Sequence, residues 1–266
     1  MLKMEDSQMS FLFRDQSWPQ LGEYLKKRTL LILPVGTTEE HGPHMPVDTD
    51  ARIAEAYGTR LAAALPPEIP VLLMDTIRYG YSMKIMRQWP GTIVVRSRVF
   101  MDMIFDICRS LLDMGFEKLA ILDCHGGHGG PLNTVSRELC DATDKAVAII
   151  NPFVMSRDEF NAARKSPAGG ALHACEWETS VVLHISPEVV DMLKATDVDM
   201  MRYHSDFVAG DNCLGQQRVT WSTWYLQPSK TGTYGDPTVA SAETGRIIMD
   251  AAVANGVRFL KEYWSH

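Results

Sequence analysis

Nearly continuous apolar runs alternate with helical patterns along this chain. The first run, residues 29–35, has the composition expected of a strand buried on both faces. The other strand-like runs are residues 71–74, 92–95, 118–123 and 146–150. This alternation predicts an α/β fold of three layers, in which helices flank a mostly parallel sheet.

Apolar residues at helical spacing fill the intervals between these runs. From Asp50 onward, Ile53, Tyr57 and Leu61 share one face, and Asp50 lies near the helix start, where a carboxylate is favoured. The other predicted helices cover residues 98–114, 132–142, 156–164 and 239–263, the last with a pattern interrupted near Asn255-Gly256. Residues 187–237 have weak periodicity and many turn formers, and we expect loops there that shape the rim of a pocket.

Composition and charge narrow the class of protein. The chain has 266 residues, 45% hydrophobic and 22% charged, and we expect residues 1–266 to form a single domain. A net charge of -7 with scattered Lys and Arg leaves no basic footprint for nucleic acid. The N-terminus lacks the apolar core of a signal peptide, and no apolar run is long enough to span a bilayer. We therefore expect a cytoplasmic enzyme with neither nucleic acid nor membrane as a partner.

Cysteine usage agrees with that compartment. The five cysteines are widely spaced, and no CxxC pair is present. They are interpreted as reduced thiols, mostly buried, and the absence of cysteine pairs argues against a closed structural zinc site.

The densest group of potential metal ligands is TTEEHGPHMPVDTD, directly after the first strand. Carboxylates beside imidazoles at the carboxyl end of a parallel strand lie where an open α/β sheet places its site. The alternative is a solvated acidic loop. The candidate residues of this segment are Glu39, Glu40, His41, His44, Asp48 and Asp50.

A second group, DCHGGHGG, follows the strand of residues 118–123 and contains His125 and His128. Its glycines let the backbone come close to an ion or a substrate. A phosphate cradle is the alternative, but the stretch matches neither GxGxxG nor a Walker sequence. Neutral imidazole suits zinc, iron or manganese.

A third group, HACEWETS, contains His173, Glu176 and Glu178. Two residues apart, the two glutamates cannot share one helix face, so one must point away. The alternative is a surface helix start with capping carboxylates. Together the three groups supply enough ligands for two divalent ions with a bridging carboxylate, which would lower the pKa of a bridging water from about 15.7 towards about 7 and so favour hydrolysis.

These motifs resemble the creatininase (creatinine amidohydrolase) family. The four matching stretches, in the family's order, are LPVGTTEEHGPHMPVDTD, DCHGGHGG, HACEWETS and TYGDPTVASAETG, spanning residues 33–245. The resemblance implies a mostly parallel sheet covered on both faces, two divalent ions (Zn, Mn or Fe) per chain, and a homo-oligomer, often a hexamer.

The resemblance also implies roles for individual residues. Asp50 would bridge the two ions, and Glu178 would complete the shell of the second ion, because Gly127 stands where creatininase itself has a glutamate. His173 would be the proton shuttle to the leaving group. The implied metal ligands are Glu39, His41, Asp50, His125 and Glu178, and the implied catalytic residues are His173 and Glu178.

Departures from the family pattern bear on the substrate. Asp123 and His128 replace the usual asparagines around the second motif, and YGYSMKIMRQW precedes PGT where relatives commonly carry a Glu-His pair. The alternative interpretation of the latter stretch is a solvated loop with one buried Trp. The candidate substrate-binding residues are Lys84, Arg87, Trp89, His128 and Trp177.

Three functions compete. The first is a two-metal hydrolase that opens a small cyclic amide or cleaves a related non-peptide C-N bond in a small polar substrate, with creatinine disfavoured by the departures above. The second is a hydrolase that opens a cyclic polyol ketone of the inosose type, suggested by the altered segment of residues 84–89. The third is a metal-dependent binding or sensor protein.

Overall fold

The main sheet is parallel throughout. The computed structural model describes residues 11–214, 218–219, 221 and 224–266. Within these ranges the strands lie in the order β2-β1-β3-β4, and β1 pairs with β3 from Leu30 opposite Lys118 to Val35 opposite Asp123. The four strands are β1 (Leu30–Val35), β2 (Val71–Leu73), β3 (Lys118–Asp123) and β4 (Val147–Ile150).

The central strands are buried on both faces because their side chains alternate between two cores. Leu30 and Ile32 belong to one hydrophobic cluster, whereas Leu31 and Leu33 belong to the other. A strand with both faces buried has few positions for polar residues, which explains the unbroken apolar run in the sequence.

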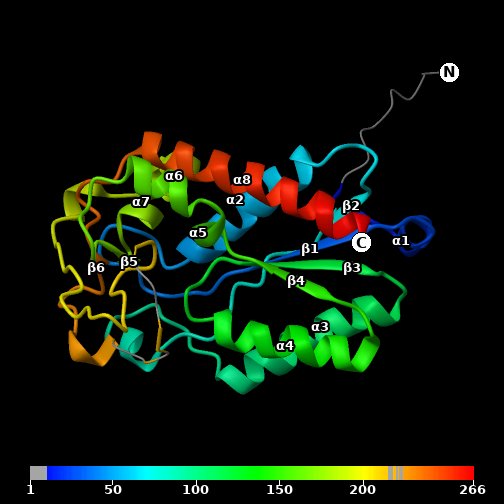
Figure 1. Cartoon of the computed structure of the whole chain (residues 1–266), viewed down its shortest axis with the longest axis horizontal. Helices are drawn as coiled ribbons and strands as arrows, with labels where there is room; N and C mark the ends of the chain where they lie inside the picture. Colours follow the sequence, from blue (N-terminus) through cyan, green and yellow to red (C-terminus); the bar gives the residue numbers. More distant parts are fainter. Residues whose placement is uncertain (1–10, 215–217, 220, 222–223) are drawn as a thin grey trace.

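Helices form a layer on each side of this sheet (Figure 1). On one side lie α3 (Ser97–Asp113) and α4 (Gly129–Thr143), and on the other α2 (Thr49–Ala64), α7 (Glu176–Ile185) and α8 (Ala242–Ser265). The predicted three-layer α/β fold is therefore confirmed.

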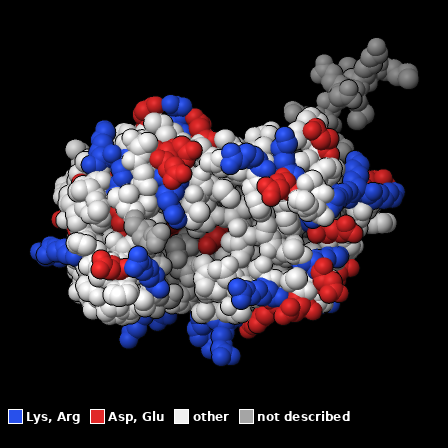
Figure 2. Space-filling model, in the orientation of Figure 1, with Lys and Arg blue, Asp and Glu red and all other residues white. Residues whose placement is uncertain are grey.

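Shorter elements complete the described chain. The helices are α1 (Trp18–Leu25), α5 (Pro152–Met155) and α6 (Arg157–Ala163), and an antiparallel pair is formed by β5 (Ala171–His173) and β6 (Tyr234–Gly235). The 3-10 segments are η1 (Phe13–Asp15), η2 (Lys84–Gln88), η3 (Pro187–Val189), η4 (Met192–Lys194) and η5 (Trp224–Leu226). Among the described residues, no helix combines the length and apolar character needed to cross a membrane. On the face in Figure 2, basic and acidic side chains are interspersed.

The loops that follow β1 and β3 leave the same edge of the sheet. The first runs from Gly36 to the start of α2 at Thr49, and the second runs from Cys124 to the start of α4. A Cβ on Gly36 would lie 2.6 Å from the backbone nitrogen of Ala51, so glycine lets the loop return against the first turn of α2. This close return places Asp50 beside the end of β1.

Residues 92–95, predicted as a strand, do not form one. The Ile93 N-H donates to the Thr38 carbonyl at 2.9 Å, and the Val95 N-H donates to the Gly80 carbonyl at 3.1 Å. Because these partners lie on separate segments, no continuous ladder forms. The prediction was wrong since an extended apolar stretch can be tied down by single hydrogen bonds.

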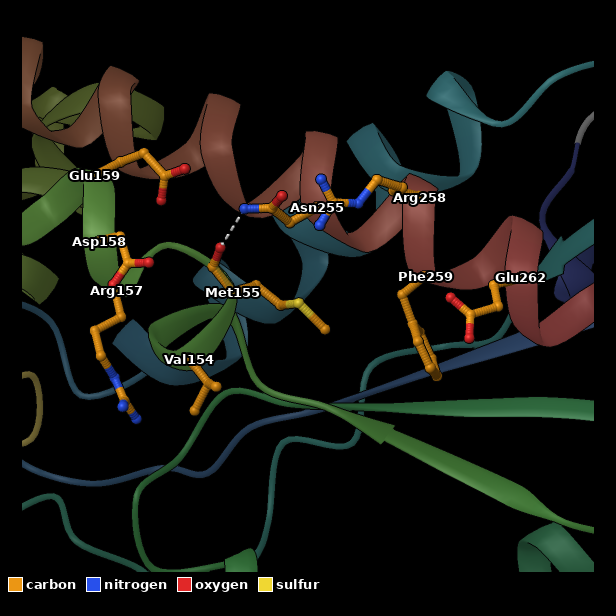
Figure 3. A pocket seen from close by; sticks show the side chains of 9 residues that line it. All are labelled: Val154, Met155, Arg157, Asp158, Glu159, Asn255, Arg258, Phe259 and Glu262. Carbon is orange, nitrogen blue, oxygen red and sulfur yellow. Dashed lines mark hydrogen bonds between the residues drawn. The ribbon is translucent and has the colours of Figure 1, made fainter. Parts of the chain in front are cut away.

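The sequence interruption at Asn255-Gly256 does not break α8. A Cβ on Gly256 would lie 2.6 Å from the Tyr57 hydroxyl, so the glycine permits close packing against α2. The Asn255 side chain donates to the Met155 carbonyl at 2.8 Å and ties α8 to α5 (Figure 3). Asn255 and Gly256 therefore lie within a continuous α8 and contact α5 and α2.

Gly245 provides a test of the packing of α8 on α7. Gly245→Ala should lower the free energy of unfolding by about 1–3 kcal/mol, because the new Cβ would collide with the Ser180 carbonyl. Gly22→Ala in α1 is the matched control, since nothing lies within 4 Å of its Cβ position. Helix propensity should make this control more stable by up to about 1 kcal/mol. Equilibrium urea denaturation measures both, and equal stability of the two variants would contradict the close contact.

Candidate metal centre

The loop after β1 and the first turn of α2 supply one side of the centre. Glu39 and His41 come from the loop, and Asp50 comes from the helix. His41 Nδ1 lies 3.0 Å from the Glu39 carbonyl oxygen, an acceptor that places the proton on Nδ1. His41 Nε2 is thereby directed to Asp50 Oδ1, 3.2 Å away.

The turn after β3 supplies the opposite side. His125 Nδ1 lies 2.8 Å from Asp50 Oδ2 and 3.2 Å from Glu39 Oε2. The backbone N-H of His125 donates to Asp123 Oδ1. A Cβ on Gly127 would lie 2.8 Å from His125 Nε2. A side chain at residue 127 would therefore require this imidazole to move.

The β5–α7 connection brings in the third group. Glu178 Oε1 lies 3.9 Å from His41 Nε2, and the His173 ring lies 4.4 Å from the His41 ring. Glu176 points away, because its carboxylate accepts the N-H groups of Lys165 and Ser166. The expectation that only one of the two glutamates faces the site is thus confirmed.

These side chains form two adjacent triads of buried residues. One contains Glu39, Asp50 and His125, and the other contains His41, His173 and Glu178. Within each triad the potential ligand atoms lie within 4.8 Å of one another. Asp50 stands between the triads, with Oδ1 near His41 and Oδ2 near His125.

Burial and opposite charges compete at this centre. Burial lowers the pKa of His41, but the Asp50 carboxylate outweighs it and raises the value to about 9. Burial likewise opposes the charge on His125, yet Glu39 and Asp50 raise its pKa to about 9. Burial raises the pKa of Asp50, but His41 and His125 hold it well below its usual range. Asp50 is therefore a carboxylate in a region that attracts cations.

The donor set fits two divalent ions. Glu39 Oε2 and Glu178 Oε2 are buried, and among the described residues neither accepts a well-aligned hydrogen bond. Unsatisfied buried carboxylate oxygens are costly, and cations would satisfy them. Mixed imidazole and carboxylate ligands suit zinc, manganese or iron.

Several supporting residues had no role assigned from the sequence. Ser82 Oγ donates to Glu39 Oε1 at 2.9 Å, and His44 Nε2 lies 2.9 Å from Thr179 Oγ1. His44 falls within the first motif, and Ser82 lies in the stretch YGYSMKIMRQW, where the sequence pointed to Lys84, Arg87 and Trp89 and gave no signal for the serine. Only the folded chain shows that Ser82 holds a ligand.

Glu40 is linked to His173 through both its backbone and its side chain. His173 Nε2 lies 2.8 Å from the Glu40 carbonyl oxygen and 3.4 Å from Glu40 Oε1. Burial lowers the pKa of His173, but the hydrogen bond and charge of Glu40 raise it to about 10. The pair therefore holds a proton beside the second triad.

The predicted substrate-binding residues fall in different places. Trp177 is 1% exposed, stacks on Phe153 at 3.7 Å and donates its indole N-H to Ser156, so it belongs to the hydrophobic core. The prediction that Trp177 binds substrate was wrong, because Phe153 covers its ring and Ser156 accepts its indole N-H within the core. The buried His128 ring packs against two other rings. Its centroid lies 4.6 Å from that of His125 and 4.2 Å from that of Phe100.

The candidate substrate-binding residues in the stretch before PGT have two different locations. Trp89 lines a cavity of about 350 Å³ beside Glu40. Lys84 and Arg87 lie on η2 and are not among the residues that line this cavity. Substrate binding by Lys84 and Arg87 stays a prediction.

Comparison with known proteins agrees with these observations. A family model described as creatininase, creatinine amidohydrolase, matches residues 14–260. A relative named mycofactocin precursor peptide peptidase, from Mycobacterium ulcerans, is 32% identical over 225 residues, covering 82% of this chain and 79% of that protein. A 3-dehydro-scyllo-inosose hydrolase from Thermotoga maritima is 28% identical over 193 residues, covering 70% of this chain and 60% of that protein.

The fold is also similar to solved structures. A structure named creatininase Mn superposes with a TM-score of 0.79 at 21% sequence identity, covering 96% of this chain and 98% of that chain. The match of the family model to nearly the whole chain agrees with the order of the motifs and with the two triads they form. The chain belongs to the creatininase family of metal-dependent hydrolases.

Proposed function

We propose that this protein hydrolyses an amide C-N bond of a small polar substrate, with two divalent ions, Zn, Mn or Fe, held by the two triads. The observation that carries this proposal is the position of Asp50, whose two oxygens lie 3.2 Å from His41 Nε2 and 2.8 Å from His125 Nδ1. Asp50 would bridge the ions, with Glu39 and His125 on one and His41 and Glu178 on the other.

The ions, when bound, would lower the pKa of a water molecule and polarise the substrate carbonyl. The protein's own residues would orient the reacting groups and transfer the proton. The water oxygen adds to the carbonyl carbon, the C-N bond breaks, and a proton must reach the departing nitrogen. Glu40 holds Nε2 of His173, so this imidazole is positioned to deliver the proton.

Two observations support an amide as the bond that is cleaved: the geometry of the site and the names of the relatives. The family description and the peptidase relatives both name enzymes that cleave amide bonds. We therefore include the amide of a short peptide beside the cyclic amide. The inosose hydrolase relative supports a second candidate, hydrolytic opening of a cyclic polyol ketone. The single domain stays a prediction, and so does the assembly into a homo-oligomer such as a hexamer.

Elemental analysis tests the bridging role of Asp50. The purified protein should contain about two divalent ions per chain, and Asp50→Ala should lose both, because each ion would lose the ligand that they share. Asp48→Ala is the matched control, since Asp48 forms an ion pair with Arg52 at 2.7 Å and lies outside the triads. One tightly held ion that survives Asp50→Ala would refute the bridge.

His173→Gln separates a proton shuttle from a metal ligand. As a shuttle, His173 is expected to contribute about 10²–10⁴-fold to kcat, while both ions stay bound. His184→Gln on α7 should leave kcat unchanged, because His184 contacts Arg60 and lies outside the triads. Loss of one ion from His173→Gln would instead make it a ligand.

A substrate panel tests the bond class. Metal-loaded protein should release an amine from a short peptide or from a formylated aminopyrimidine, or open the ring of creatinine, and Glu39→Gln should abolish that turnover. Absence of turnover with every C-N substrate, together with opening of an inosose, would replace the first candidate with the second.

A further inference from the structure

A cavity of about 350 Å³ lies one side chain away from the second triad. Its lining comes from the loop after β1, from Trp89-Pro90 and from the turn of residues 230–231. The residues that line it are Glu40, Gly42, Pro43, Val47, Trp89, Pro90, Lys230 and Thr231. Since the Glu40 carboxylate also contacts His173, the cavity lies on the His173 side of the centre.

The turn beside this cavity is held in a fixed position. Gly232 has a φ of +90°, and a Cβ there would collide with the Glu40 carboxylate, so glycine is required for the close approach. Ser229 Oγ accepts the N-H groups of Thr231 at 3.2 Å and of Gly232 at 3.1 Å. The positions of Lys230 and Thr231 are thereby fixed relative to Glu40.

The polar groups facing the cavity favour an anion. Glu40 is 4% exposed, and its Oε2 accepts the Gly42 N-H at 2.9 Å. Its Oε1 accepts no well-aligned hydrogen bond from the described residues, but it lies 3.4 Å from His173 Nε2, whose positive charge offsets that of the carboxylate. Within the described ranges, Lys230 has no ion-pair partner. Thr231 Oγ1 is buried and makes no hydrogen bond with the described residues. An ammonium and a hydroxyl are thus available as donors.

The remaining walls and the volume limit the size of the ligand. Trp89, Pro43, Pro90 and Val47 present an aromatic ring and apolar surface. The cavity has the volume of about a dozen water molecules at roughly 30 Å³ each, which is close to one or two amino-acid residues. A C-terminal amino-acid residue with an apolar side chain matches the cavity, because its side chain suits the apolar walls and its carboxylate suits the donors.

We propose that this cavity binds the leaving group of the reaction, the C-terminal residue of a short peptide. Lys230 and Thr231 donate to the terminal carboxylate, and Trp89 packs against the side chain. The departing nitrogen then lies towards His173, and the acyl part of the substrate lies over the two triads. This assignment rests on the proposed amide hydrolysis and specifies which end of the substrate is recognised.

A matched pair of peptides tests the assignment in the metal-loaded protein. One peptide ends in a free carboxylate and the other, of the same sequence, ends in a carboxamide. The carboxylate peptide should have about 10-fold higher kcat/KM, mainly through KM, because a hydrogen bond to a charged group is lost in the amide. Lys230→Ala should remove most of this advantage, because it should lower kcat/KM for the carboxylate peptide more than for the amide peptide. Thr231→Val should reduce the advantage about 3-fold.

Lys26→Ala is the control, because Lys26 forms an ion pair with Glu23 beside α1 and does not line the cavity. Its preference for the carboxylate peptide should match that of the unaltered protein. An undiminished preference in Lys230→Ala would overturn the proposal.

A binding measurement separates this assignment from the proposed reaction. Isothermal titration of the metal-loaded protein with N-acetyl-phenylalanine should show about 10-fold weaker binding in Lys230→Ala than in the unaltered protein. N-acetyl-phenylalanine amide should lose less affinity than the acid does in this variant, because its terminus carries no charge. Binding lost in Lys230→Ala without hydrolysis of any peptide would contradict the reaction alone, whereas equal Kd values in the two proteins would overturn the subsite.

Discussion

The buried charge of Asp50 is the constraint on which the rest of this structure depends. A carboxylate removed from water is costly unless cations surround it, and here His41 and His125 face its two oxygens from opposite sides. Keeping that arrangement requires the first turn of α2 to lie against the end of β1, which Gly36 permits. The same two oxygens allow one residue to serve both triads.

The parallel sheet explains why residues distant in sequence meet at this carboxylate. β1 and β3 are neighbours in register, so the loops that follow them leave the sheet side by side. The third group reaches the same place through β5 and the start of α7, which carry His173 and Glu178. Around these residues, Ser82 donates to Glu39 and Glu40 contacts His173, so a side chain of each triad is oriented by a neighbour outside it.

Beyond the triads, neighbouring residues shape the surroundings of the centre. Gly127 leaves the space that the His125 ring occupies, and His128 is buried against Phe100. The turn that carries Lys230 is fixed against Glu40, so a cation lies beside the proton-holding pair of Glu40 and His173. In the proposed function, the triads would supply the chemistry of the reaction, and these neighbouring loops would select the substrate.

The sequence by itself determined the fold class, the family and the segments whose side chains form the two triads. It could do so because strands buried on both faces need unbroken apolar runs, and because metal ligands need particular side chains at the strand ends. Only the tertiary structure decided which side chains meet. Trp177 was expected to bind substrate but packs in the core, residues 92–95 form no strand, and Ser82 and Lys230 acquire their positions from partners far away in sequence. Such contacts depend on how loops return to the sheet, and local sequence patterns do not contain that information.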